Sequence, residues 1–353
     1  MHGWVFLLSF AVSLALMPAV RALSWRLDIL DRPNDRKVHR EPTPLLGGLA
    51  IYGGFLTAIA ALAWSDRLLQ LFLACCTFLL ILGLVDDRLD LHARHRLVLQ
   101  VLVAGVVAAA GVRFSLGMGM LVAIVVTVVW LIGVVNATNC LDCIDGAAGT
   151  YTLVACGWFF LLAIGQGRLV IAALAVALAG GALGFLRHNF PPATIFMGDL
   201  GSTFVGLMLG ILSLATAPAG RPDLFRFPVE TLVLVPLAYD FLLVHLRRYR
   251  GGIRNLRDLL SSAGKDHLPH RLLAMSLSPR EADLVLGCLA MVWGLAAWLL
   301  AQGYAVGGAM ATLLGTLALF YGEDLLLRLT RRRAIVAPVV LRHEALDGAT
   351  GGD

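Results

Sequence analysis

The sequence predicts an all-α integral membrane protein, a polytopic bundle of about eleven transmembrane helices. Of its 353 residues, 59% are hydrophobic and only 14% are charged, and the mean hydropathy is +0.83. Soluble domains carry about 25% charged residues, and a soluble core of this length could not bury so much apolar surface. The apolar residues also form separate runs of about 17–25 residues, the length that crosses a hydrocarbon core of about 30 Å.

The expected spans follow one another with mostly short connections, so we expect a single transmembrane catalytic domain over residues 1–330. The apolar runs lie at residues 2–23, 45–64, 68–85, 97–112, 118–135, 150–165, 169–186, 201–217, 228–246, 282–302 and 304–327. In the longest connection, Arg247–Glu281, residues Asn255–Ala263 are predicted to form a short interfacial helix. Residues 331–353 are predicted to be a disordered cytoplasmic tail, basic at first and then glycine-rich.

An odd number of spans places the two termini on opposite sides of the membrane. The connections after the odd-numbered spans, with the C-terminal tail and Arg21 at the edge of the first span, carry 23 of the 28 Lys and Arg residues. Because positive residues favour the cytoplasmic side, we expect a multi-pass protein of the inner (plasma) membrane with its N-terminus outside and its C-terminus in the cytoplasm. The net charge of +5 fits lipid head groups or an anionic substrate. The sequence contains no basic soluble domain, so nucleic acid is not an expected partner.

Five polar stretches beside the apolar runs all fall on the predicted cytoplasmic side. An Asp near the hydrocarbon costs about 2.5–3.5 kcal/mol on insertion scales. So many carboxylates at the ends of spans indicate one shared polyanionic or metal-binding site on the cytoplasmic face. The stretches are Asp31–His39, Asp86–Asp90, Asn136–Asp145, Gly198–Ser202 and Lys265–Leu272.

The acidic stretch Asp86-Asp87-Arg-Leu-Asp90 directly follows the third apolar run. On a helix end, its carboxylates share one face, where they can hold a Mg²⁺ ion that bridges a diphosphate or position a base. The alternative is an ordinary charged end of a span. Arg94 and Arg96 can face a phosphate, or serve only to fix the topology.

A second stretch repeats a polar residue every three positions, at Asn136, Asn139, Asp142 and Asp145. On a continuous helical turn these side chains would form one polar stripe. The connection contains no Lys or Arg, so its two carboxylates point to a metal or a substrate donor. Helix capping would explain only part of the pattern.

The third stretch places Asp199 between two glycines, which allow the backbone to approach a ligand closely. A helix that begins at about Ser202 would direct its free N–H groups toward anionic oxygens. The alternative is a simple N-terminal cap of the eighth span.

The long basic connection contains His267, His270 and Arg271. Histidine can switch its proton near neutral pH, and arginine can bind a phosphate with two hydrogen bonds. Zinc is an alternative, although a third nitrogen or sulfur ligand is not nearby in the sequence. The first connection adds Lys37 and His39, ahead of a Gly47-Gly48 pair that permits close helix packing; a generic basic loop is the alternative there.

Taken in order, these stretches resemble the polyprenyl-phosphate N-acetylhexosamine-1-phosphate transferase family, from about Asp31 to Leu272. The resemblance implies transfer of a HexNAc-1-phosphate, with GlcNAc the favoured sugar, from a UDP-sugar to undecaprenyl or decaprenyl phosphate. UMP leaves, and the lipid-linked sugar diphosphate initiates a cell-envelope polysaccharide such as O-antigen or teichoic acid. Expected partners are the UDP-HexNAc, the polyprenyl phosphate and membrane lipid, and a homodimer is an allowed assembly.

The resemblance also implies roles for individual residues. The cofactor is expected to be Mg²⁺, with Mn²⁺ as a substitute. The expected metal ligands are Asp199, Asp87 and Asp142, and the expected catalytic residues are Asp86, Asp87, Asp142 and Asp145. The expected substrate contacts are Asn136, Asn139, His267, His270, Arg271, Lys37, His39 and Arg94.

The sequence departs from the family pattern at Cys143, Ala147 and Pro269. Pro269 replaces a histidine, so the loop reads HLPH, which argues against the branch that uses a MurNAc-pentapeptide substrate. Two other functions stay open at this point. A Mg²⁺-dependent intramembrane prenyltransferase would use the DDRLD stretch, but would leave the GDLGS and HLPHR stretches without a role. A transporter would be expected to carry its ionisable residues near the membrane midplane.

Overall fold

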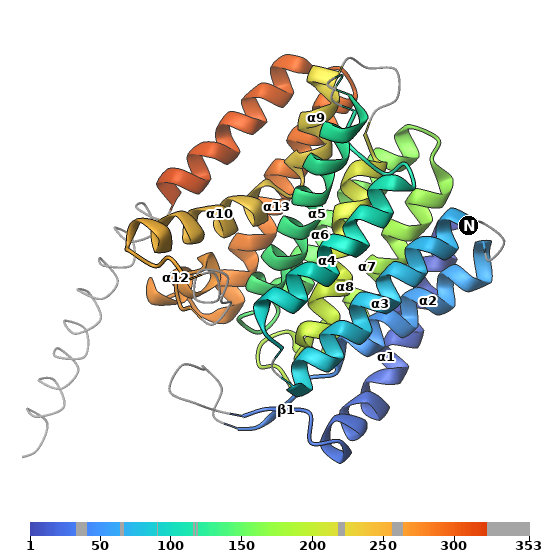
Figure 1. Ribbon diagram of the computed structural model, residues 1–353, viewed down its shortest axis with the longest axis vertical. Coiled ribbons are helices and arrows are strands. Elements are labelled where there is room, and N and C mark those ends of the chain that lie inside the picture. Colours follow the sequence, from blue (N-terminus) through green and yellow to red (C-terminus); the bar gives the residue numbers. More distant parts are fainter. Residues whose placement is uncertain are drawn as a thin grey trace, which may run out of the picture.

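The computed structural model describes residues 1–32, 41–63, 67–89, 91–115, 117, 119–217, 223–255 and 264–322. Over these ranges the chain is a bundle of long helices, which confirms the predicted all-α membrane class (Figure 1). Two short strands, β1 (Leu30–Asp31) and β2 (Thr43–Pro44), pair antiparallel at one end of the bundle. Residues 256–263 of the predicted interfacial helix and the whole predicted tail lie outside the described residues.

The helices keep the order of the apolar runs. They are α1 (His2–Arg26), α2 (Gly47–Ala63), α3 (Arg67–Leu89), α4 (Ala93–Ala109), α5 (Met120–Leu141), α6 (Ala147–Gly165), α7 (Leu169–Asn189), α8 (Gly198–Ala215), α9 (Asp223–Leu232), α10 (Val235–Arg250), α12 (Leu268–Ala274) and α13 (Pro279–Ala301). A further apolar helix covers Ala305–Gly322.

Eight of the helices described are long and apolar enough to cross a membrane. Helix α2 is apolar but shorter, so the count of eleven spans stays a prediction. The prediction of one continuous helix over residues 228–246 is wrong, because the chain turns at Val233 and Leu234, between α9 and α10. Pro236 lies in the first turn of α10, where a residue without an N–H group is tolerated at a helix start but not in a helix interior.

Helix α8 forms the centre of the bundle and is buried over nearly its whole length. It packs against α2, α3 and α5, and its apolar side chains face neighbours in all directions, as expected for a fully buried helix. Because α8 begins with the Gly198–Ser202 stretch, this packing places Asp199 beside the ends of α3 and α5.

Small residues allow this close contact. A Cβ atom on Gly83 of α3 would overlap the backbone of Leu200, and one on Gly48 of α2 would overlap the backbone of Gly201. The predicted role of the Gly47-Gly48 pair in close packing is therefore confirmed. The resulting backbone approach fixes where α8 begins relative to the acidic end of α3.

We predict that Gly83→Ala destabilises the protein by about 1–3 kcal/mol, because the added methyl group meets backbone atoms that cannot rotate away. Gly105→Ala on α4 is the matched control, since a Cβ atom there meets nothing within 4 Å. Thermal unfolding of both variants in detergent measures the difference. Equal unfolding temperatures would show that the packing of α3 on α8 is looser than described.

Candidate active site

The centre of the site is an ion-pair bridge between α3 and α8. Asp86, in the last turn of α3, is buried, and its Oδ1 accepts a hydrogen bond of 2.8 Å from the Leu91 N–H. Arg96, in the first turns of α4, donates through Nη1 to Asp86 Oδ2 and also to Asp199 Oδ2, at 3.1 Å from the latter. One guanidinium thus holds together two carboxylates that are 113 positions apart in the chain.

Asp87 caps α8 from a distant part of the sequence. Its Oδ1 accepts a hydrogen bond from the Asp199 N–H at 3.0 Å, and its Oδ2 accepts one from the Leu200 N–H at 3.2 Å. The prediction that this helix begins at about Ser202 is wrong: it begins one turn earlier, at Gly198, whose φ of +74° suits glycine. The first free N–H groups of α8 therefore bind a carboxylate of the protein itself, which the helix dipole favours.

The polar end of α5 completes the network. Asn139 donates from Nδ2 to Asp199 Oδ1 at 2.7 Å and to Ser202 Oγ at 2.9 Å. One turn earlier, Asn136 donates to Gln100 Oε1 at 2.8 Å. Both asparagines line one small cavity together with the carboxylates and Arg96.

Asp142 and Asp145 separate from that stripe, because α5 ends at Leu141. The prediction of one helical stripe from Asn136 to Asp145 is therefore wrong. Asp142 lies within electrostatic range of the carboxylate cluster. Burial, followed by the negative charges of Asp199, Asp87 and Asp145, raises its pKa well above 3.8. Asp145 instead accepts a hydrogen bond from the Ala193 N–H at 2.8 Å and so ties down the connection between α7 and α8.

The histidine loop is organised by an aspartate that sequence reasoning missed. Asp240 of α10 accepts hydrogen bonds from the Leu268 N–H at 2.7 Å and from Arg271 Nη2 at 3.3 Å. Its other oxygen lies 2.9 Å from Nδ1 of the fully buried His267. The sequence does contain a signal for Asp240, because it is an acidic residue within the apolar run 228–246. Ionisable residues in membrane spans are usually functional.

A second ion pair fixes the start of the same loop. Arg248 of α10 binds Asp266 through two hydrogen bonds of 2.8 and 2.6 Å. Pro269, the departure from the family pattern, lies in the first turn of α12 and is buried, a position that suits proline. His270 is half-buried, and burial, followed by the charges of His267 and Lys265, lowers its pKa.

The histidine loop and the carboxylate cluster meet at the end of α5, which α10 contacts (Figure 1). Burial, and then the neighbouring Cys140, Asp240 and Asp142, raise the pKa of the Cys143 thiol well above its ordinary value. This shift favours the neutral thiol over the nucleophilic thiolate. It lies within electrostatic range of one carboxylate from each half of the site, Asp142 and Asp240.

The structure thus brings together Asp86, Asp87, Asn139 and Asp199 by direct contacts, with Asn136 and Asp142 close by. Arg96, rather than the exposed Arg94, contacts the carboxylates. Gln100, Asp240 and Arg248 are site residues that the sequence analysis did not name. Lys37 and His39 lie outside the described residues.

The residues present suit a cation that is completed by substrate oxygens. Within the described ranges, no group of three or more His, Cys, Asp or Glu side chains forms a ready-made metal cage. However, Asp142 and Asp199 carry neighbouring carboxylates, and Asp142 makes no side-chain hydrogen bond to the rest of the described chain. Mg²⁺ is commonly held by one or two carboxylates together with substrate phosphates, so this donor set fits such an ion.

Comparison with known proteins identifies the family of the chain. The model of glycosyl transferase family 4 matches residues 69–217. The probable undecaprenyl-phosphate N-acetylglucosaminyl 1-phosphate transferase of Bacillus subtilis is 30% identical over 305 residues, covering 83% of each chain. The decaprenyl-phosphate N-acetylglucosaminephosphotransferase of Mycolicibacterium smegmatis is 34% identical, covering 76% of this chain and 74% of its own.

A third relative, the undecaprenyl-phosphate alpha-N-acetylglucosaminyl 1-phosphate transferase of Yersinia pestis, is 29% identical and covers 78% of each chain. The matched region contains the ends of α3 and α5 and the start of α8, which carry the carboxylate network. The chain is therefore a membrane-bound transferase that belongs to glycosyl transferase family 4.

Proposed function

We propose that the protein transfers GlcNAc-1-phosphate from UDP-GlcNAc to undecaprenyl or decaprenyl phosphate and releases UMP. The observation that carries this proposal is the group of carboxylates around Arg96 at the end of an apolar bundle. Such a site suits a reaction between two polyanions, one of which is held in the membrane. The names of the relatives support the sugar and the lipid, and they favour this reaction over a prenyltransferase or a transporter.

In the proposed reaction, a phosphate oxygen of the lipid attacks the sugar-linked phosphorus of UDP-GlcNAc. A P–O bond forms to the lipid phosphate, and the P–O bond to the UMP phosphate breaks. Asp86 and Asp87 border the acceptor position, and Arg96 neutralises charge beside it. Because Asp87 already binds two backbone N–H groups, we assign it to holding Asp199 in place, and we assign Asp86 to orienting the acceptor.

Asp199 and Asp142 are the residues that would hold Mg²⁺, with Mn²⁺ as a substitute. When bound, the ion supplies positive charge to the diphosphate of the donor. Asn139 fixes the orientation of Asp199 through one oxygen. On the other side of the α5 end, His267, His270 and Arg271 form the proposed contacts to the nucleotide, since Asp240 and Arg248 hold that loop against α10.

The orientation in the membrane follows from the charge distribution. We infer that the carboxylate end of the bundle faces the cytoplasm of the inner (plasma) membrane, because 23 of the 28 Lys and Arg residues fall on the predicted cytoplasmic side. The homodimer stays a prediction.

The proposal is tested with purified protein, polyprenyl phosphate in nanodiscs, and UDP-GlcNAc carrying ³²P in its sugar-linked phosphate. Transfer of the sugar phosphate moves the label into the lipid and leaves unlabelled UMP. Label retained in UDP, with sugar in the lipid, would mean that the sugar alone moves. Prenyl transfer without sugar transfer would reject the proposed function.

We predict that Arg96→Gln lowers kcat at least about 100-fold, because the carboxylates of Asp86 and Asp199 lose their shared donor. Arg88→Gln is the control: Arg88 is exposed in the same region, in the last turn of α3. Initial rates of lipid-linked product formation measure both variants. A similar loss in the two would attribute the effect to general charge rather than to the bridge.

A second prediction concerns the histidine loop. Asp240→Asn should raise KM for UDP-GlcNAc about 10–100-fold with a smaller effect on kcat, because a charged acceptor of the His267 and Leu268 hydrogen bonds is lost. Asp28→Asn, at an exposed ion pair, is the matched control. An unchanged KM for Asp240→Asn would show that the histidine loop does not belong to the donor site.

The raised pKa of Asp142 gives a pH prediction. A carboxyl group that binds its proton more tightly in the folded state stabilises that state at low pH, and this stability is lost as pH rises above 3.8 through the raised value. Without divalent ions, the wild type should therefore lose thermal stability relative to Asp142→Asn as pH rises, and Mg²⁺ should reverse the loss. Parallel pH profiles for the two proteins would contradict this assignment.

A further inference from the structure

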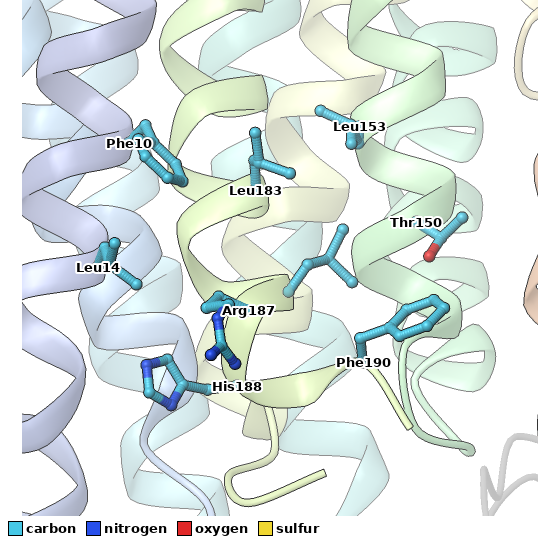
Figure 2. A pocket seen from close by; sticks show the side chains of 9 residues that line it. Phe10, Leu14, Thr150, Leu153, Leu183, Arg187, His188 and Phe190 are labelled. Atoms are coloured by element: carbon cyan, nitrogen blue, oxygen red, sulfur yellow. The ribbon is translucent and has the colours of Figure 1, made fainter. Parts of the chain in front are cut away.

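An apolar groove of about 760 Å³ lies between α1, α6 and α7. Its lining residues are Phe10, Leu14, Thr150, Leu153, Leu183, Leu186, Arg187, His188 and Phe190. Figure 2 shows Arg187 and His188 at the end nearest the loop that follows α7, with Phe10, Leu153 and Leu183 further along the helices. The groove thus has an apolar body and a basic end, and its volume lies within the range of ligand-binding clefts.

A second cavity, of about 370 Å³, continues from that basic end. It shares Arg187 and His188 with the groove and extends over the loop after α7 to Arg280 of α13. Three basic side chains therefore border the joined opening, and the lining of both cavities in the described chain contains no carboxylate. This charge pattern is complementary to an anionic group attached to an apolar chain.

The joined cavities are separate from the candidate active site. The cavity at the carboxylate network is lined by residues such as Asp86, Arg96 and Asp199 and shares none with either of them. An acceptor lipid must bring its phosphate to that network to react. The occupant of the groove is therefore not expected to be the reacting lipid.

We propose that this groove is a binding site for an anionic phospholipid. An acyl chain lies between α1, α6 and α7, and the head-group phosphate binds Arg187, His188 and Arg280. Arginine binds phosphate strongly through paired, charge-assisted hydrogen bonds. Basic pockets between transmembrane helices also bind anionic head groups on the cytoplasmic side, which is the side proposed for this end of the bundle.

The site has a structural link to the connection that leads into α8. Arg280 donates from Nε to the Pro191 carbonyl oxygen at 3.0 Å, and the Ala193 N–H donates to Asp145 at 2.8 Å. A phosphate at Arg280 would thus join α13 to the segment that precedes Asp199. The bound lipid is expected to stabilise this segment without entering the reaction.

The test is lipid binding by the purified full-length protein, measured by native mass spectrometry with phosphatidylglycerol or phosphatidylcholine of identical acyl chains. The wild type should prefer phosphatidylglycerol. Arg187→Gln combined with Arg280→Gln should weaken that binding at least about tenfold, to the level of phosphatidylcholine. Leu153→Trp, which fills the apolar part of the groove, should weaken the binding of both lipids.

Arg26→Gln is the matched control. Arg26 is an exposed basic residue at the C-terminal end of α1, and it lines neither cavity. Thermal unfolding of each variant verifies that it is folded.

Equal binding of the two lipids by the wild type would overturn the proposal, and so would a preference that survives both the double substitution and Leu153→Trp. Displacement of phosphatidylglycerol by polyprenyl phosphate, with the same dependence on Arg187, would show instead that the groove is the acceptor site. A dimer whose interface excludes lipid from the groove would also overturn the proposal.

Discussion

The structure depends on the neutralisation of carboxylates at the end of an apolar bundle. Asp86 and Asp87 lie in the last turn of α3 and Asp199 in the first turn of α8, and each carboxylate would be costly beside the hydrocarbon if left alone. Arg96 bridges two of them, and the N-terminus of α8 binds the third. These contacts hold α3, α4 and α8 in one arrangement. These contacts do not neutralise Asp142. A cation and a diphosphate would complete the charge balance beside that residue.

The same helices explain how the site is divided. The end of α5 lies between the carboxylate network and the histidine loop, and the loop is held by α10 through Asp240 and Arg248. The break between α9 and α10 at Val233 and Leu234 separates α10 from the preceding helix. A fixed carboxylate side and a separately anchored histidine side suit a two-substrate reaction in which the acceptor comes from the membrane and the donor from solution.

Much of this arrangement could be predicted from the sequence, because apolar runs and acidic span ends are local signals. The bundle class and the gathering of Asp86, Asp87, Asn139 and Asp199 into one site belong to that part. The start of α8 could not be predicted, since it is set by Asp87, a residue 112 positions away from Asp199. Asp145 also could not be assigned, because the period of three suggested a continuous helix, whereas α5 ends at Leu141. Asp240 was detectable in principle as an acid in an apolar run, but its partner His267 is defined only by tertiary packing.

The most direct test of this account is a cryo-electron microscopy structure of the protein in lipid nanodiscs with UDP-GlcNAc and Mg²⁺. We expect density for the ion between the donor diphosphate and the carboxylates of Asp199 and Asp142, with Asp87 still bound to the N-terminus of α8 and Arg96 beside Asp86. A diphosphate bound away from Asp199, or an ion held by a different set of side chains, would contradict the account.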